Sequence, residues 1–261
     1  MSFLVIPITA LIASILTFFS GFGLGTILLP VFTIYYDAPI AVALTAIVHF
    51  TNNIFKLGLI YKNINRKIVL KFGLPSLIAA LVGAYLLKNL FSKTIVIYNY
   101  YLEFTEINHQ ITLFNLIIGL LIIFFTLFEM IPYFKKLSFN EDKLIFGGLL
   151  SGFFGGLSGH QGALRSVFLV KLNLPKESFI ATGTAIACIV DIARMSVYAF
   201  SFNFIHIQTN STVLLISIVA AIVGALIGNK LLKKTTVSFL KWFVSLFMIL
   251  IAILMILGFL S

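Results

Sequence analysis

The feature that most constrains this chain is a polar, glycine-rich interruption inside a long apolar run. The run extends from about Leu144 to Val170, and residues 155–165 within it hold four glycines. The same stretch carries polar and ionisable side chains, namely Ser158, His160, Gln161 and Arg165. Lipid cannot hydrogen-bond a loosened backbone and solvates an arginine poorly, so such a segment is tolerated at membrane depth only inside protein or beside a wet cavity. The interruption therefore predicts an internal polar site.

A plainer counterpart lies in the first half of the chain, where glycines at positions 21, 23 and 25 interrupt another long apolar run. Two interrupted hydrophobic segments, one in each half, are a pattern typical of the binding site of a secondary transporter.

The composition predicts an all-α, polytopic integral membrane protein. Hydrophobic residues make up 61% of the chain and charged residues 10%, against roughly 25% charged in soluble domains. We expect the protein to lie in the cytoplasmic (inner) membrane and to keep its first span, because no cleavable signal pattern precedes it. The net charge of +10 comes from short loops that face lipid headgroups, so we expect membrane lipids and no nucleic acid as partners.

The apolar runs predict about eight transmembrane segments, each long enough for the roughly 20 residues that a crossing needs. They cover approximately residues 3–36, 40–61, 68–91, 112–131, 144–170, 179–200, 212–232 and 239–260. The first and fifth are the interrupted ones, and a straight helix of the first segment's length would be ~50 Å long, well beyond a bilayer core. Each is therefore expected to be a bent or re-entrant pair of half-helices.

The order of these features predicts two pseudo-symmetric four-segment repeats, residues 1–138 and 139–261, which together form one membrane domain. A shift of 138 positions aligns two polar pairs, Asn53 with Asp191 and Lys56 with Arg194. Basic loop residues divide evenly between the two sides, so the membrane orientation stays open.

A face of small residues, Gly224, Ala225 and Gly228, allows close helix packing. It fits a contact between protomers of a homodimer or a contact within one chain.

Gly23 and Gly25 are candidate substrate-binding residues at the first interruption. Glycine lets a ligand approach the backbone, and the start of a half-helix offers free N–H groups. The alternative is close helix packing through small residues.

A polar stripe in the second predicted segment supplies further candidates. His49, Asn53 and Lys56 fall at i, i+4 and i+7 on one helical face, with Thr45 and Asn52 alongside. Asn52 and Asn53 could bind an oxyanion, with Lys56 adding positive charge, and His49 could pass a proton. The alternative is an interhelical hydrogen-bond network with Lys56 reaching the membrane interface.

The second half supplies the candidates with the strongest charge. Arg165 has a fork of donors that matches a sulfonate, sulfite or carboxylate, although it could instead anchor to headgroups. Asp191 and Arg194, three residues apart in the segment that also holds Thr182 and Thr184, could neutralise each other as a structural pair. Alternatively, Asp191 is a proton- or cation-coupling group and Arg194 belongs to the anion site.

No enzyme motif, cofactor site or metal site is expected from the sequence. Histidines 109 and 206 lie in predicted loops, and Cys188 has no second cysteine with which to form a disulfide or bind a metal. Ser158 and His160 are too close in sequence to indicate a nucleophile and its base.

These motifs resemble the sulfite exporter TauE/SafE family across essentially the full chain. The resemblance rests on the first glycine break with Pro30, on residues 41–45 and 49–56, and on the second-half stretches 155–162 and 181–184. It implies transport of sulfite, a sulfonate, sulfoacetate, thiosulfate or an organic anion, often linked to protons. His160 and Gln161 replace glycines of the common pattern, and Phe168 stands where a proline would match Pro30.

The sequence thus predicts a transporter that moves a small anion by alternating access around a midplane site, with His49 and Asp191 as proton-coupling residues. A passive anion channel would share the basic cavity without depending on a proton gradient. An intramembrane enzyme that uses His160 or His49 is the other alternative.

Overall fold

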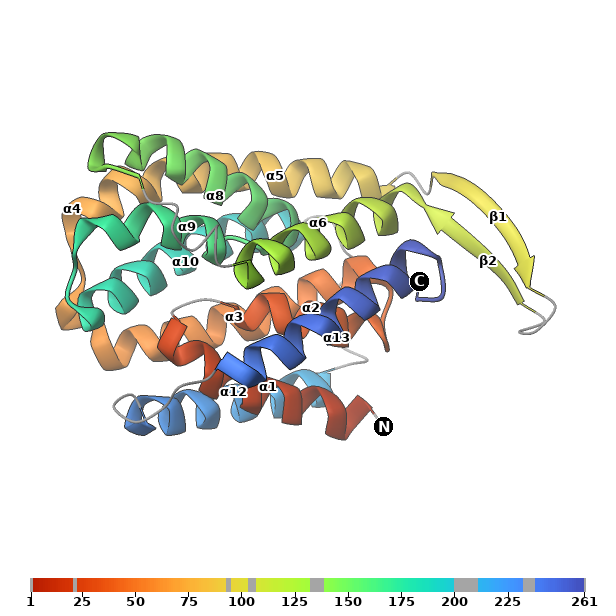
Figure 1. The fold of residues 1–261 in the computed structure, drawn as a ribbon, viewed down its shortest axis with the longest axis horizontal. Coiled ribbons are helices and arrows are strands. Elements are labelled where there is room, and N and C mark those ends of the chain that lie inside the picture. Colours follow the sequence, from red (N-terminus) through yellow and green to blue (C-terminus); the bar gives the residue numbers. More distant parts are fainter. Residues whose placement is uncertain are drawn as a thin grey trace.

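The computed structural model describes residues 2–20, 23–92, 95–102, 107–131, 139–199, 211–231 and 238–260. It is an elongated bundle of helices with a β-hairpin at one end (Figure 1). The principal helices are α1 (Ser2–Ser20), α2 (Leu24–Thr33), α3 (Ala38–Ile60), α5 (Leu74–Ser92), α6 (Leu113–Met130), α8 (Leu144–Ser158), α9 (Gly162–Leu169), α10 (Lys176–Ala199), α12 (Ser211–Leu231) and α13 (Ser238–Ile256). The short helical turns are η1 (Tyr61–Asn63), α4 (Arg66–Ile68), η2 (Val69–Gly73), η3 (Glu141–Lys143) and η4 (Val170–Leu172).

The prediction of a helical, multi-pass membrane protein is confirmed. Within the described residues, five helical stretches are long and apolar enough to cross a membrane: Pro39–Asn63, Arg66–Leu90, Leu113–Met130, Lys176–Ala199 and Ser211–Lys230. Shorter apolar helices cover Ser2–Phe18, Leu24–Thr33 and Ser245–Ile256. Each of the eight predicted segments contains helix, while the number of crossings stays a prediction.

Both interrupted segments are broken helices. The break in the first segment lies between α1 and α2, and the break in the fifth segment lies between α8 and α9. Gly23 and Gly159 lie at these breaks with φ angles of 106° and 82°, in the left-handed region that only glycine adopts without strain. Gly21 and Phe22, which also belong to the predicted first break, lie outside the described residues.

The connection before α6 is a non-helical addition to this helical fold that the sequence did not predict. This segment forms an antiparallel hairpin of β1 (Val96–Leu102) and β2 (Ile107–Thr112), which projects from the end of the bundle in Figure 1. The connection is rich in the β-branched and aromatic residues that favour strands. The Tyr100 hydroxyl donates a hydrogen bond to the Leu257 carbonyl at 2.6 Å, which ties the hairpin to the residues after α13.

Small residues bring α5 and α8 into backbone contact. Gly148, Gly152 and Gly156 recur every fourth residue along α8, and a Cβ on each would lie only 2.1–2.4 Å from a backbone carbonyl oxygen of residues 72–80. A Cβ on Gly83 of α5 would lie equally close to the Phe153 carbonyl oxygen of α8. These glycines therefore fix how closely the two helices pack.

The small-residue face of α12 packs within the same chain. A Cβ on Gly224 would lie 2.4 Å from the Leu11 carbonyl oxygen of α1, and one on Gly228 would lie 2.8 Å from Phe18 Cβ. Of the two alternatives for this face, the structure uses the one within the chain.

Helices from the two halves of the sequence alternate in the bundle. Helix α1 packs against α12, α5 against α8, α3 against α10 and α6 against α13. As a result, α1, α2, α3 and α12 form one bundle, and α5, α8, α9 and α10 form another. The two bundles meet where α3 contacts α10.

Candidate functional site

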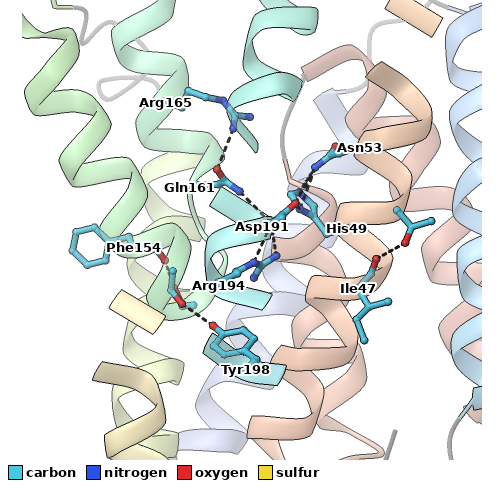
Figure 2. Close-up of polar contacts among 12 residues, drawn as sticks. Ile47, His49, Asn53, Phe154, Gln161, Arg165, Asp191, Arg194 and Tyr198 are labelled. Carbon is cyan, nitrogen blue, oxygen red and sulfur yellow. Dashed lines mark hydrogen bonds and ion pairs between the residues drawn. The ribbon is translucent and has the colours of Figure 1, made fainter. Parts of the chain in front are cut away.

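A buried carboxylate, Asp191 of α10, lies at the centre of a polar cluster between α3 and α10 (Figure 2). Its Oδ2 atom is 2.7 Å from His49 Nδ1 of α3. Its Oδ1 atom accepts a hydrogen bond from Arg194 Nε at 3.0 Å and forms an ion pair with Arg194 Nη2 at 2.8 Å. One carboxylate thus joins the histidine of the first half to an arginine of the second.

Amide side chains extend the cluster in both directions. Asn53 Nδ2 donates to Asp191 Oδ2 at 3.4 Å and lies 3.2 Å from His49 Nδ1. On the other side, Gln161 Nε2 donates to Asp191 Oδ1 across a longer 3.5 Å, and Gln161 Oε1 accepts from Arg165 Nη1 at 3.3 Å. Figure 2 shows this line of contacts from Arg165 through Gln161 to Asp191.

Glycines from both breaks line this cluster. A Cβ on Gly159 would lie 2.6 Å from Arg194 Nη1, so only glycine leaves room for the guanidinium. A Cβ on Gly25 would lie 3.5 Å from His49 Cδ2 and 3.9 Å from the Gly159 carbonyl oxygen. The two breaks therefore approach each other beside His49. Gly23 contacts Thr17 instead, with 3.3 Å between its Cβ position and Thr17 Cγ2.

Two predicted residues of the second break do not contact Asp191, and one of them, His160, faces α6. His160 stacks on Phe125 with ring centroids 5.3 Å apart, and its Nδ1 lies 3.0 Å from Ser158 Oγ. Ser158 Oγ donates to the Phe154 carbonyl at 3.2 Å. His160 Nε2 is buried without a hydrogen-bond partner among the described residues. It is an internal polar atom next to the cluster, but it does not bond to it.

The predicted polar stripe of α3 is divided between two sides of the helix. His49 and Asn53 face α10, whereas Asn52 lies 3.1 Å from Ser14 Oγ of α1. With its amide turned to satisfy both ends, Asn52 donates to the Ala221 carbonyl of α12 at 3.0 Å and accepts from Lys56 Nζ at 3.2 Å. Successive helical residues point about 100° apart, so a stripe that includes both 52 and 53 is wide enough to contact two helices.

The threonines of the same two segments do not bond to Asp191. Thr182 Oγ1 accepts from the Asn65 backbone N–H at 2.9 Å, and Thr184 Oγ1 donates to the Ile180 carbonyl at 2.8 Å. Thr45 Oγ1 is buried without a partner in the described part of the chain. The structure thus gathers His49, Asn53, Gln161, Arg165, Asp191, Arg194 and Gly25 with Gly159, and keeps Asn52, Ser158, His160 and Gly23 apart from Asp191.

Sequence reasoning missed Tyr198, one turn beyond Arg194. Its hydroxyl donates to the Gly156 carbonyl at 2.6 Å and ties α10 to α8 just before the break. Four residues separate Arg194 from Tyr198, and this helical spacing is the signal that could have identified it. His206 lies outside the described residues.

The side chains named in this cluster include two arginines, one carboxylate and one histidine. Arg165 and Arg194 contribute two charges, Asp191 removes one, and His49 adds another when protonated. The arginines, Gln161 and Asn53 supply hydrogen-bond donors to a region that is buried in protein. Such a site suits a small anion, and the hydrogen bond between His49 and Asp191 suits proton exchange. No group of three or more His, Cys, Asp or Glu residues that could hold a metal ion occurs in the described part of the chain.

No curated protein and no solved structure matches the chain. The family profile described as sulfite exporter TauE/SafE matches residues 6–255, which include every residue of the cluster. The chain therefore belongs to the sulfite exporter TauE/SafE family of membrane transporters.

Proposed function

We propose that this protein is a secondary transporter of a small sulfur-containing or organic anion, of the sulfite, sulfonate, sulfoacetate or thiosulfate class, in the cytoplasmic membrane. The observation that carries the proposal is the buried cluster in which Arg194 pairs with Asp191 and Arg165 joins the same carboxylate through Gln161. The attraction between an anion and a guanidinium is strong in a region of low dielectric, so an anion that enters the cluster is held by two arginines.

The two arginines have different parts in this proposal. Arg194 is already neutralised by Asp191, with atoms 2.8 Å apart, so an anion has to share or displace that carboxylate. Arg165 meets the cluster through Gln161, whose Oε1 accepts from Arg165 Nη1 at 3.3 Å, so an anion can approach Arg165 without displacing Asp191. The planar fork of Arg165 can bind two oxygens of a sulfonate or sulfite, which makes this residue the principal substrate ligand.

Proton coupling follows from the charge of the cluster. A protonated His49 adds one positive charge beside Asp191 that a neutral His49 does not supply. The added charge attracts an anion more strongly, so binding of the anion and of a proton favour each other. His49 and Asp191, whose atoms lie 2.7 Å apart, are the proposed coupling pair.

We infer that residues 1–138 and 139–261 are structural repeats. Asn53 and Asp191, which the 138-residue shift aligns, contact each other at 3.4 Å, as equivalent residues do beside a pseudo-two-fold axis. Gly83 and Gly224, which a shift of 141 aligns, both press against a backbone carbonyl of the other half.

The proposed moving units are the two interlocked bundles rather than the two sequence halves. A motion of residues 1–138 against residues 139–261 would separate α1 from α12 and α5 from α8. These helix pairs pack closely, because their glycines lie against backbone carbonyls of the partner helix. A motion of one bundle against the other changes the contact of α3 with α10, and also that of α6 with α13, because α13 contacts α2 of one bundle and α6 contacts α5 and α9 of the other. The Asp191 cluster lies at the contact of α3 with α10, as alternating access requires.

Uptake of radiolabelled thiosulfate, sulfoacetate and sulfite into proteoliposomes, with and without an imposed pH gradient, tests the proposal. We expect saturable, gradient-dependent uptake of at least one of these anions. Arg165→Met should lower it at least tenfold, Arg165→Lys should retain part of it, and Lys62→Met, at an exposed loop position, should leave it unchanged. Wild-type uptake by a folded protein carrying both Arg165→Met and Arg194→Met would contradict the proposal. Gradient-independent conductance would favour a channel.

A further inference from the structure

Besides the two arginines of the Asp191 cluster, a further buried basic side chain lies apart from that cluster. Lys56 of α3 is 5% exposed and points between α1 and α12. Its Nζ lies 5.5 Å from the centre of the Phe18 ring and 3.2 Å from the Asn52 amide oxygen. Within the described residues, no carboxylate lies at ion-pair distance from it, and no hydrogen bond joins it to Asp191 or Arg194.

This environment does not neutralise an ammonium group. Lys56 has three N–H donors, and Asn52 accepts one of them. The ring face of Phe18 adds a weak attraction. A lysine near a membrane surface usually extends its nitrogen to the headgroups, but the side chain of Lys56 is buried. A charge held this way is costly unless an anion accompanies it.

The aligned position in the second half has the anion that Lys56 lacks. Under the 138-residue shift, Lys56 corresponds to Arg194, and Asn53 corresponds to Asp191. Arg194 is neutralised by Asp191 at 2.8 Å, whereas the first half has a neutral amide at the matching position. The first-half cation therefore has no counter-charge of its own within the chain as described.

We propose that Lys56, Asn52 and Ser14 form a second binding position for a small anion of the transported class, distinct from the one at Arg165. With the Asn52 amide accepting from Lys56, the hydroxyl proton of Ser14 and two ammonium protons remain to donate to a ligand. The position lies beside the first break, because Phe18 is near the end of α1 and Gly23 contacts the neighbouring Thr17. The identity of the ligand rests on the proposed function, whereas the existence of the position rests on Lys56.

Equilibrium binding of radiolabelled thiosulfate to the purified protein in chloride-free detergent buffer tests this proposal. We expect two bound anions per wild-type chain, one in Lys56→Met and two in Lys56→Arg. Arg165→Met should also bind one, and that remaining binding should disappear when Lys56→Met is added. Since Lys56→Met removes a buried charge that has no carboxylate partner, the variant should fold and melt at or above the wild-type temperature.

Two results would overturn the proposal. One is thiosulfate binding by Lys56→Met with the stoichiometry and affinity of the wild type. The other is a Lys56-dependent position that binds chloride but not thiosulfate, because the ligand would then be a halide outside the transported class. If the wild-type protein shows no uptake but still binds thiosulfate in a Lys56-dependent way, the proposed transport function fails while the second binding position stands.

Discussion

Replacement of Gly152 by alanine tests how closely the site depends on the contact of α5 with α8. A Cβ on Gly152 would lie 2.2 Å from the Ser76 carbonyl oxygen and 2.5 Å from Ser76 Cα. Both atoms belong to the backbone and cannot move aside by changing a rotamer. An ordinary contact begins at 3.4 Å, so the helices would have to separate by about 1 Å.

The expected cost follows from this separation. A gap of about 0.5–1 Å removes a quarter to a half of the dispersion energy of the atoms that it parts. Overpacked buried sites generally lose about 1–3 kcal/mol. Gly148 and Gly156 lie on the same face and would be pulled away from residues 72–80 as well. We therefore expect the substitution to lower the free energy of unfolding by about 3 kcal/mol.

Gly58→Ala is the matched control. Gly58 is also a helical glycine, but a Cβ there would meet nothing within 4 Å. Alanine favours helix over glycine by up to about 1 kcal/mol, so this variant should melt at or slightly above the wild-type temperature. Size-exclusion thermal-stability measurements in detergent, followed by proteoliposome uptake, compare the two variants.

We expect Gly152→Ala to melt several degrees below the wild-type protein and to lose uptake. The reason is that α8 carries Ser158 and leads into the break at Gly159, which lies against Arg194. A Gly152→Ala protein as stable and active as Gly58→Ala would refute the reasoning. The contact of α5 with α8 would then be loose enough to admit a methyl group.

Three further perturbations address the cluster and the surface. Gly159→Ala forces a side chain to a φ of 82° and places its Cβ 2.6 Å from Arg194, so uptake should fall by more than the melting temperature suggests. Asp191→Asn leaves the charge of Arg194 uncompensated and should lower the free energy of unfolding by about 3–5 kcal/mol. Added thiosulfate should raise the melting temperature of this variant by more than it raises that of the wild type. Lys71 at 2.8 Å holds the pKa of Glu141 below its ordinary value of 4.5, so this stabilisation is present above that value and is lost as the pH falls through the lowered pKa. The difference in melting temperature between wild type and Glu141→Gln should therefore shrink as the pH is lowered below 4.5.

The breaks could be predicted from the sequence because their signal is local. Glycines and an arginine inside an apolar run have few stable arrangements in a membrane, and both breaks occur where they were expected. The pairing of Asp191 with Arg194 was also local, since three helical residues separate them. The hairpin of β1 and β2 was missed because a short aromatic segment between spans gives no periodic signal of the kind that marks a transmembrane helix.

The division of the α3 stripe could not be predicted, because it depends on which helices surround α3. Asn52 and Asn53 are adjacent in sequence, yet one contacts α1 and α12 while the other contacts Asp191. A helical projection gives the width of a polar stripe but not the number of neighbours that share it. The interlocking of the two halves, with α1 on α12 and α5 on α8, is likewise a property of the tertiary fold.

The proposed pseudo-two-fold axis explains why the two halves differ in sequence where they meet. Residues beside such an axis contact their own equivalents, as Asn53 and Asp191 do at 3.4 Å. Two aspartates at that distance could not both be ionised, because each carboxylate would repel the other in a buried environment. One of the two positions must therefore be neutral, and the pair that results is an amide donor with a carboxylate acceptor. At the position where symmetry brings the halves together, a second aspartate is thus excluded, and this constraint separates the two sequences at equivalent positions.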